Sequence, residues 1–278
     1  MKGLELSKKY YEEFGKAMLE KDFPQLLKYI AVGFVGSGSE RYGFDDEISI
    51  DHDFEPGFSI FLPSEDVVSR RDEFLLERAY SKLPKEFMGY KRQQILPVGG
   101  NRNGVIRTFD FYKNYLGNNF QNLSLKDWLF LPDSTLFEAT DGEVFYDGYG
   151  EFTFIRKSLN DMPKGALYKR LAGNILIMAQ SGQYNYSRCY KRGEIEASIL
   201  AKNEFINSLL KVLFLLKGKY MPYYKWSFKA LRAIYEDKMV SKISKLLLDG
   251  ENNKSKLIEE ISLYVINELK KQNLSDID

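Results

Sequence analysis

The spacing of apolar residues divides the chain into two parts of different texture. Before Met162–Pro163, short apolar runs alternate with polar residues and are separated by Gly, Asn and Pro. Beyond that point, apolar residues recur every three to four positions over long segments, which is the period of an amphipathic helix. The pattern therefore predicts an α+β domain over residues 1–158 and an all-helical bundle over residues 159–278.

Local signals place elements within the first part. We expect helices over residues 5–20, 23–32, 64–83 and 124–130, with Ser64 as the N-cap of the third. The apolar run IAVGFV, which ends in small residues, predicts a strand followed by a turn. Residues 48–62 have a strand-like pattern, residues 94–112 predict a hairpin, and residues 134–156 alternate and turn like a β-meander.

Composition and charge narrow the class of protein. Lys and Arg number 40 and Asp and Glu number 39, so there is no general positive field to hold a nucleic acid. The single cysteine, Cys189, excludes an intramolecular disulfide and a Cys-rich zinc site. The first twenty residues lack the apolar core of a signal peptide, and no apolar run is long enough to cross a bilayer. We therefore expect a cytoplasmic protein without a membrane partner.

The stretch ISIDHDF contains the only histidine of the chain, between two aspartates. Alternate side chains of a strand share a face, so Asp51 and Asp53 are expected on one face and His52 on the other. Two carboxylates on one face repel each other unless a cation lies between them, and oxygen ligands suit Mg²⁺ or Mn²⁺. Asp51 and Asp53 are thus predicted metal ligands, although Asp-x-Asp alone also fits two surface carboxylates.

A run of small residues precedes these aspartates. In VGSGSE an apolar strand end is followed by alternating Gly and Ser, a turn that exposes backbone N–H groups and hydroxyls to an anion. We predict that it binds the phosphates of a nucleotide through Gly36, Ser37, Gly38 and Ser39. A phosphate-binding turn shortly before paired carboxylates is what metal-assisted phosphoryl or nucleotidyl transfer requires.

The spacing of these residues resembles a known signature. Gly38-Ser39, Gly43 and then Asp51-His52-Asp53 is similar to the signature of the polymerase-β-type nucleotidyltransferase superfamily. The fuller string GSGSERYGFDDEISIDHDFEPGF resembles an uncharacterised bacterial branch, the domain-of-unknown-function 4037 family. The later strings DGEVFYDGYGEFTFIR, AQSGQYNYSRCYKRGE and YMPYYKWSFKALR also resemble that branch, so the resemblance spans roughly residues 30–235.

The resemblance implies a mixed sheet flanked by helices, with Gly38 and Ser39 at the start of a helix and in contact with a triphosphate. Asp51 and Asp53 hold one or two Mg²⁺, an acceptor hydroxyl attacks the α-phosphorus, and pyrophosphate leaves. The family pattern adds a third carboxylate on a neighbouring strand, for which Asp110 is the candidate. The alternatives are a base from the helical part and a protein that only binds nucleotide.

Two polar stretches of the helical part are further candidates. SGQYNYSRCYKRGE, predicted as a turn between helices, supplies Gln183, Asn185 and Arg188, and MPYYKWSFK supplies Lys225. We expect these side chains to contact the triphosphate or the base. A polar interhelical turn and an aromatic helix start are the structural alternatives. Asp45, between the turn and the paired aspartates, is expected in a solvated acidic turn.

These expectations combine into one predicted activity. The chain is expected to transfer a nucleoside monophosphate, AMP from ATP, to a hydroxyl of an acceptor that the sequence does not identify. A small molecule of the aminoglycoside kind is favoured over nucleic acid, because no basic track stands out. The alternatives are a non-catalytic nucleotide-binding regulatory module and a nucleotidyltransferase that modifies tRNA or a protein.

Overall fold

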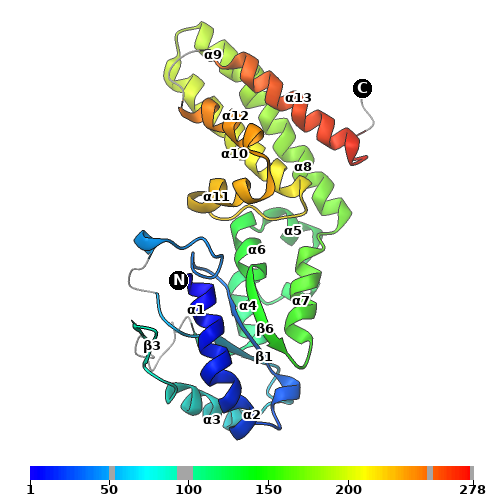
Figure 1. Cartoon of the computed structure of the whole chain (residues 1–278). Helices are drawn as coiled ribbons and strands as arrows, with labels where there is room; N and C mark the ends of the chain where they lie inside the picture. The colour runs from blue at the N-terminus through cyan, green and yellow to red at the C-terminus, as the bar shows by residue number, and fades with distance from the viewer. Residues whose placement is uncertain (50–53, 93–102, 249–252, 276–278) are drawn as a thin grey trace. The chain divides into compact units, whose positions relative to one another are not determined.

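The computed structural model describes residues 1–49, 54–92, 103–248 and 253–275. The chain divides into two compact units (Figure 1). Unit 1 comprises Met1–Leu123 and Glu138–Asp161, and unit 2 comprises Ser124–Phe137 and Met162–Asp278. The segment 124–137 therefore groups with the helical unit, although it lies far before residue 162 in the sequence.

Unit 1 is built on a mixed sheet, as the resemblance implies. Its four strands are ordered β5-β2-β1-β6. β1 pairs antiparallel with β2 and with β6, whereas β2 and β5 run parallel. The bounds are Ala31–Val35 for β1, Ser59–Leu62 for β2, Gly104–Arg107 for β5 and Gly142–Asp147 for β6. A separate two-stranded ribbon joins β3, Glu86–Phe87, to β4, Tyr90–Lys91.

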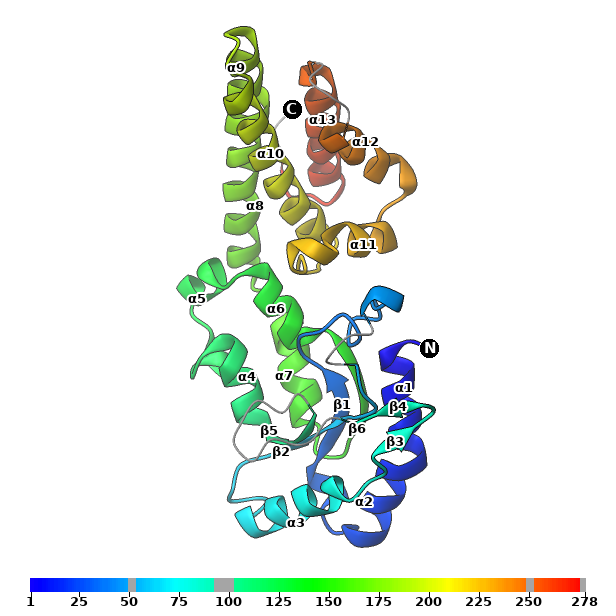
Figure 2. The ribbon, with the colours of Figure 1, turned by 90° about the vertical axis from the view of Figure 1, so that its left-hand side faces the viewer.

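Helices cover both faces of this sheet (Figure 2). Their bounds are Gly3–Tyr10 for α1, Lys16–Asp22 for α2, Arg70–Ser81 for α3, Thr108–Leu116 for α4 and Glu151–Asn160 for α7, with a π-helical turn Tyr11–Gly15 between α1 and α2. Successive side chains of β2 face opposite sides. Ile60 lies in a core cluster with Tyr10 of α1 and Leu76 of α3. Phe61 packs instead against Phe111 of α4 and Phe152 of α7, with ring centroids 5.2 and 4.1 Å away.

The predicted β-meander at residues 134–156 is wrong. The segment forms α6, Asp133–Thr140, then β6, then α7. Asp147 explains why a helix follows β6, because its carboxylate accepts hydrogen bonds from Gly150 N and Thr153 N at 2.7 and 2.8 Å. These bonds satisfy N–H groups at the start of α7, so a side-chain cap overrides the strand-like composition that follows it.

Other expected elements are shorter or displaced. Residues 23–32 contain only the 3₁₀ turn Leu27–Tyr29 before β1 begins. Another 3₁₀ turn, Glu47–Ser49, lies at the start of the stretch 48–62, in which only β2 is a described strand. Most of the first arm and the turn of the hairpin expected at 94–112 lie outside the described residues; in the remainder β5 leads directly into α4, so residues 108–112 are helical and not part of a strand. A third 3₁₀ turn, Phe120–Asn122, follows α4.

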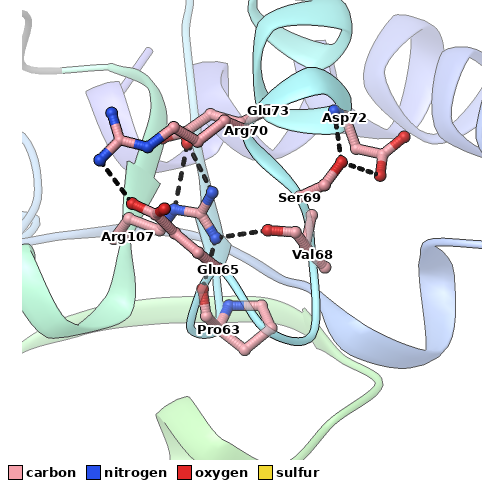
Figure 3. Close-up of polar contacts among 8 residues, drawn as sticks. All are labelled: Pro63, Glu65, Val68, Ser69, Arg70, Asp72, Glu73 and Arg107. Atoms are coloured by element: carbon pink, nitrogen blue, oxygen red, sulfur yellow. Dashed lines mark hydrogen bonds and ion pairs between the residues drawn. The ribbon is translucent and has the colours of Figure 1, made fainter.

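The helix expected over residues 64–83 begins at Arg70, because Ser69 rather than Ser64 caps it (Figure 3). The Ser69 hydroxyl accepts a hydrogen bond from Asp72 N at 3.2 Å. Nearby, Arg107 at the end of β5 donates to Glu73 and to the carbonyls of Pro63 and Val68 (Figure 3). This buried guanidinium fixes the point at which β5 becomes α4.

Unit 2 is helical. Its helices are α5 Leu125–Phe130, α8 Lys164–Met178, α9 Ser187–Lys191, α10 Ile195–Leu216, α11 Tyr224–Ile234, α12 Asp237–Leu248 and α13 Ser255–Lys271. A π-helical segment, Ala179–Tyr186, joins α8 to α9. Gly182 allows it to approach α10, because a Cβ there would lie 2.3 Å from the Phe205 ring. Within the described residues, no helix has the length and apolar character needed to cross a membrane.

Candidate functional site

The glycine turn, residues 36–43, follows the buried strand β1. Gly36, Gly38 and Gly43 have φ angles of 100°, 134° and 67°, in a region that side chains rarely adopt. A Cβ on Gly36 would also lie 2.9 Å from the hydroxyl of Tyr115. The path of the backbone at the end of β1 therefore depends on glycine.

Helix α4 supports this turn. The Ser37 N–H donates a hydrogen bond to the Tyr115 hydroxyl at 2.9 Å, and Phe111, one helical turn earlier, lies against Gly36. The N–H of Ser37 is thus engaged by the protein. The other predicted phosphate-binding groups are the backbone N–H groups of Gly36, Gly38 and Ser39 and the hydroxyl of Ser39.

No regular helix follows Gly38 and Ser39, which corrects the arrangement implied by the resemblance. The Gly38 carbonyl accepts from Arg41 N at 3.0 Å and the Ser39 carbonyl accepts from Phe44 N at 2.8 Å. These bonds close a tight turn, and a 3₁₀ turn, Glu47–Ser49, comes next. Burial raises the pKa of Tyr42, and the nearby Glu138 carboxylate raises it further.

Arg41 stabilises the glycine turn, and this role was not predicted from the sequence. Only 3% of the residue is exposed. Its guanidinium donates to the Val35 carbonyl at 2.7 Å and to Asn103 Oδ1 at 3.1 Å, and it lies 4.3 Å from the centre of the Phe34 ring. Because Val35 is the last residue of β1, these contacts let Arg41 fix the end of that strand.

The same network reaches the chain just after the paired aspartates. Asn103 Nδ2 donates to Glu55 Oε1 at 2.9 Å, and Glu55 follows Asp53 by two residues. Arg41 and Asn103 therefore connect the glycine turn to Glu55. Asp51, His52 and Asp53 lie outside the described residues, so their predicted roles stay predictions.

Asp45 is not in a solvated turn, which corrects that expectation. Only 2% of the residue is exposed, and its Oδ2 accepts a hydrogen bond from Gly3 N at 2.8 Å. Gly3 is the first residue of α1, where a carboxylate stabilises the unpaired N–H groups and the helix dipole. The side chain of Lys2 also donates to the Asp45 carbonyl. Asp45 therefore attaches α1 to the segment after the glycine turn.

Asp110 lies in the first turn of α4 and is exposed. The neighbouring strand β5 has the sequence GVIR and contains no carboxylate. Asp110 therefore differs from the family pattern, in which the third carboxylate stands on a strand. Among the residues that the structure describes, no group of three or more His, Cys, Asp or Glu side chains is placed to hold a metal. The oxygen donors of Asp51, Asp53 and Asp110 are nevertheless the kind that Mg²⁺ prefers.

The candidates of unit 2 stand on regular helices rather than in the predicted turn. Gln183 and Asn185 belong to the π-helical segment and Arg188 belongs to α9. The helical path ends only near Gly193. Gln183 donates to Glu259 of α13 at 2.7 Å, and the Arg188 guanidinium lies 4.4 Å from the Tyr184 ring centre. These contacts are internal to unit 2.

Lys225 stands at the start of α11, which begins at Tyr224, two residues after Pro222. Its ammonium lies 5.0 Å from the centre of the Trp226 ring. The neighbouring Tyr224 lines a cavity of unit 2, whereas Lys225 and Gln183 do not. The sequence alone does not distinguish the residues that line the cavity from those that do not.

Comparisons with known proteins agree with the resemblance. The family described as a domain of unknown function, DUF4037, matches residues 128–227, which include the end of α5, the elements from α6 to α10 and the start of α11. Among curated proteins, none matches the chain. A solved nucleotidyltransferase-like protein from Exiguobacterium sibiricum 255-15 is similar, with 11% identity and a TM-score of 0.38, over 94% of this chain and 75% of that chain. That level of similarity is too low to bear on the residues of the site.

Proposed function

We propose that this chain is a cytoplasmic nucleotidyltransferase that transfers AMP from ATP to a hydroxyl of a small molecule. The observation that supports it most is the glycine turn and its connection through Arg41 and Asn103 to Glu55. Glu55 lies two residues after Asp53, so a partly buried network links the glycine turn to the chain just after the aspartates that are predicted to bind metal.

Each part of the proposed site has a chemical role. The N–H groups of Gly38 and Ser39 bind and orient the triphosphate. Asp51 and Asp53, with Asp110 as the third candidate, hold Mg²⁺ or Mn²⁺. The bound ion neutralises charge on the phosphates and so favours departure of pyrophosphate.

A second candidate function is a regulatory module that binds nucleotide without transferring it. One observation favours it over the enzyme: the strand β5 has no carboxylate. In this case the glycine turn binds a nucleotide, while no group activates an acceptor hydroxyl.

Calorimetric titration tests the proposal. ATP, GTP, CTP and UTP are titrated with and without Mg²⁺ into the wild type and an Asp51→Ala, Asp53→Ala double variant. We expect Mg²⁺-dependent binding of ATP that the double variant loses. A Glu12→Ala, Glu13→Ala variant removes two exposed carboxylates elsewhere in unit 1 and should bind as the wild type does.

The outcomes separate the two functions. Binding of no triphosphate overturns both. Binding that needs neither Mg²⁺ nor the two aspartates supports the regulatory module. If ATP binds as proposed, ATP labelled at the α-phosphorus then reports transfer to candidate acceptors, with cationic, neutral and anionic alcohols compared in parallel.

A further inference from the structure

Unit 2 contains a cavity of about 450 Å³, a size typical of small-molecule sites. It lies among the end of α5, the start of α6, α8, α10 and the start of α11. All of its lining residues belong to unit 2. None of its lining residues belongs to the glycine turn of unit 1.

The cations in the wall of this cavity fall into two kinds. Arg170 is fully used by the protein: it forms an ion pair with Asp133 at 2.8 Å and donates to the carbonyls of Trp128 and Leu131. Lys169 and Lys211 also line the cavity. Neither has an ion-pair partner within the described residues. Because Asp133 and Arg170 cancel each other, the remaining charge of the wall is positive.

Aromatic rings gather at the same cavity. Phe130, Tyr223 and Tyr224 line it and are 76%, 51% and 72% exposed. The rings of Tyr223 and Tyr224 are in contact, with centroids 4.4 Å apart. Exposed aromatic rings beside unpaired cations can bind a flat ring that has a negative group.

Gly173 of α8 leaves part of the wall open. It lines the cavity, and a Cβ built on it has no heavy atom within 4 Å. A larger side chain at this position would enter open space instead of a packed neighbour. The cavity can therefore be filled by substitution without removing a charge and without disturbing the core.

We propose that this cavity binds a small aromatic anion, whose negative group pairs with Lys169 and Lys211 and whose ring lies against Tyr223 and Tyr224. The proposal does not depend on nucleotide transfer at the glycine turn. At this cavity the two lysines are expected to repel a cationic molecule.

Three probes that share a benzene ring and differ in charge test this proposal. Phenyl phosphate is the anion, benzyl alcohol the neutral probe and benzylamine the cation. Both tryptophans of the chain, Trp128 and Trp226, lie in unit 2, close in sequence to the lining residues Leu129 and Tyr224, so their fluorescence reports on this unit. We expect phenyl phosphate to change the fluorescence at the lowest concentration and benzylamine at the highest.

Matched variants locate the binding site. Lys211→Gln should weaken phenyl phosphate binding by about tenfold or more, because a charge-assisted contact is lost. Lys202→Gln, on the same helix but outside the cavity, should not. Gly173→Leu should abolish binding, whereas Gly165→Leu makes the same change on α8 away from the cavity and should leave binding intact. Circular dichroism verifies that each variant is folded.

Two results would overturn the proposal. One is equal binding of benzylamine and phenyl phosphate. The other is phenyl phosphate binding that survives both Gly173→Leu and Lys211→Gln. The Asp51→Ala, Asp53→Ala variant should bind phenyl phosphate normally, so failure of the nucleotide proposal and failure of this one are distinguishable.

Discussion

The two units use their cations in opposite ways. In unit 1, Arg41 is buried. Its guanidinium donates hydrogen bonds to Val35 and Asn103 and lies over the ring of Phe34. In the cavity of unit 2, Lys169 and Lys211 form no ion pair among the described residues, and Lys211 acts on the Asp133 carboxylate only through its charge. A guanidinium with several donors can satisfy backbone carbonyls where a chain turns, whereas an unpaired ammonium leaves its charge to a ligand. The cation of unit 1 therefore stabilises the fold, whereas the two cations of unit 2 are available to bind a ligand.

The largest expected difference between the units is in alkaline solution. Burial raises the pKa of Tyr11 to about 12, and it also raises the pKa of Tyr42, Tyr80 and Tyr112 above the ordinary value. A tyrosine with a raised pKa contributes its full stability below pH 10, and this contribution is lost as the pH rises through the folded-state pKa. Because several tyrosines of unit 1 are raised together, we expect their combined effect to exceed that of a single substitution.

These four tyrosines belong to unit 1, whereas the strongest such shift in unit 2 is that of Tyr235. We expect unit 1 to unfold between pH 10 and about 12, before unit 2. Circular dichroism follows the whole chain during a pH titration and tryptophan fluorescence follows unit 2. Tyr11→Phe keeps the ring and removes the ionisable group, so it should raise the pH of the first transition. Coincident transitions would contradict the prediction.

Among single substitutions in the two units, Arg41→Ala should be the most damaging. It removes the guanidinium that donates to the Val35 carbonyl and to the Asn103 amide oxygen, at an expected cost of about 3 kcal/mol. Urea unfolding followed by circular dichroism measures the loss. Arg78→Ala removes an exposed arginine of α3 and should change the free energy of unfolding by less than about 0.5 kcal/mol. Equal effects would show that Arg41 does not hold the turn.

Gly36→Ala should cost less, about 2 kcal/mol, because it combines a left-handed φ with a close contact to Tyr115. Gly43→Ala is the matched control: its φ is also positive, but a Cβ there meets nothing within 4 Å. We expect a loss of only about 1 kcal/mol for that variant in the same urea experiment. If the two variants lose equal stability, the contact with Tyr115 contributes nothing.

The smallest expected effect has the opposite sign. Gly173→Ala places a methyl group in the open space of the cavity and improves the helix propensity of α8, so it should stabilise the protein by about 0.5–1 kcal/mol. Unfolding followed by tryptophan fluorescence measures this gain in unit 2. A loss of stability would mean that the cavity wall is already closed at Gly173.

The sequence predicts those elements whose signals are local. The run AVGFV and the glycines after it predict β1 and its turn, and three-to-four spacing predicts the long helices of the second part. The segment after β6 departs from its prediction because Phe152, Thr153, Phe154 and Ile155 favour strands by composition. The cap from Asp147 decides the outcome, and a cap acts through a few specific hydrogen bonds that periodicity does not register.

The candidate site was predictable only in part, for a related reason. Glycine and serine in the turn have a conformational signature, but Arg41 does not, because arginine is an exposed residue in most positions. Its role depends on a hydrogen bond to Asn103, which is 62 residues away in the sequence. The cavity of unit 2 is likewise formed by residues from α5, α8, α10 and α11, which no local pattern brings together.

The division of the chain also has a consequence for biosynthesis. The strand β6 completes the sheet of unit 1, yet it follows residues 124–137, which pack in unit 2. A ribosome therefore releases the first piece of unit 2 before unit 1 is complete. That piece contains Asp133, whose partner Arg170 is made only after β6. Neither unit corresponds to one uninterrupted stretch of the chain, so a truncation at residue 158 or 161 would separate the segment 124–137 from the helices it packs against.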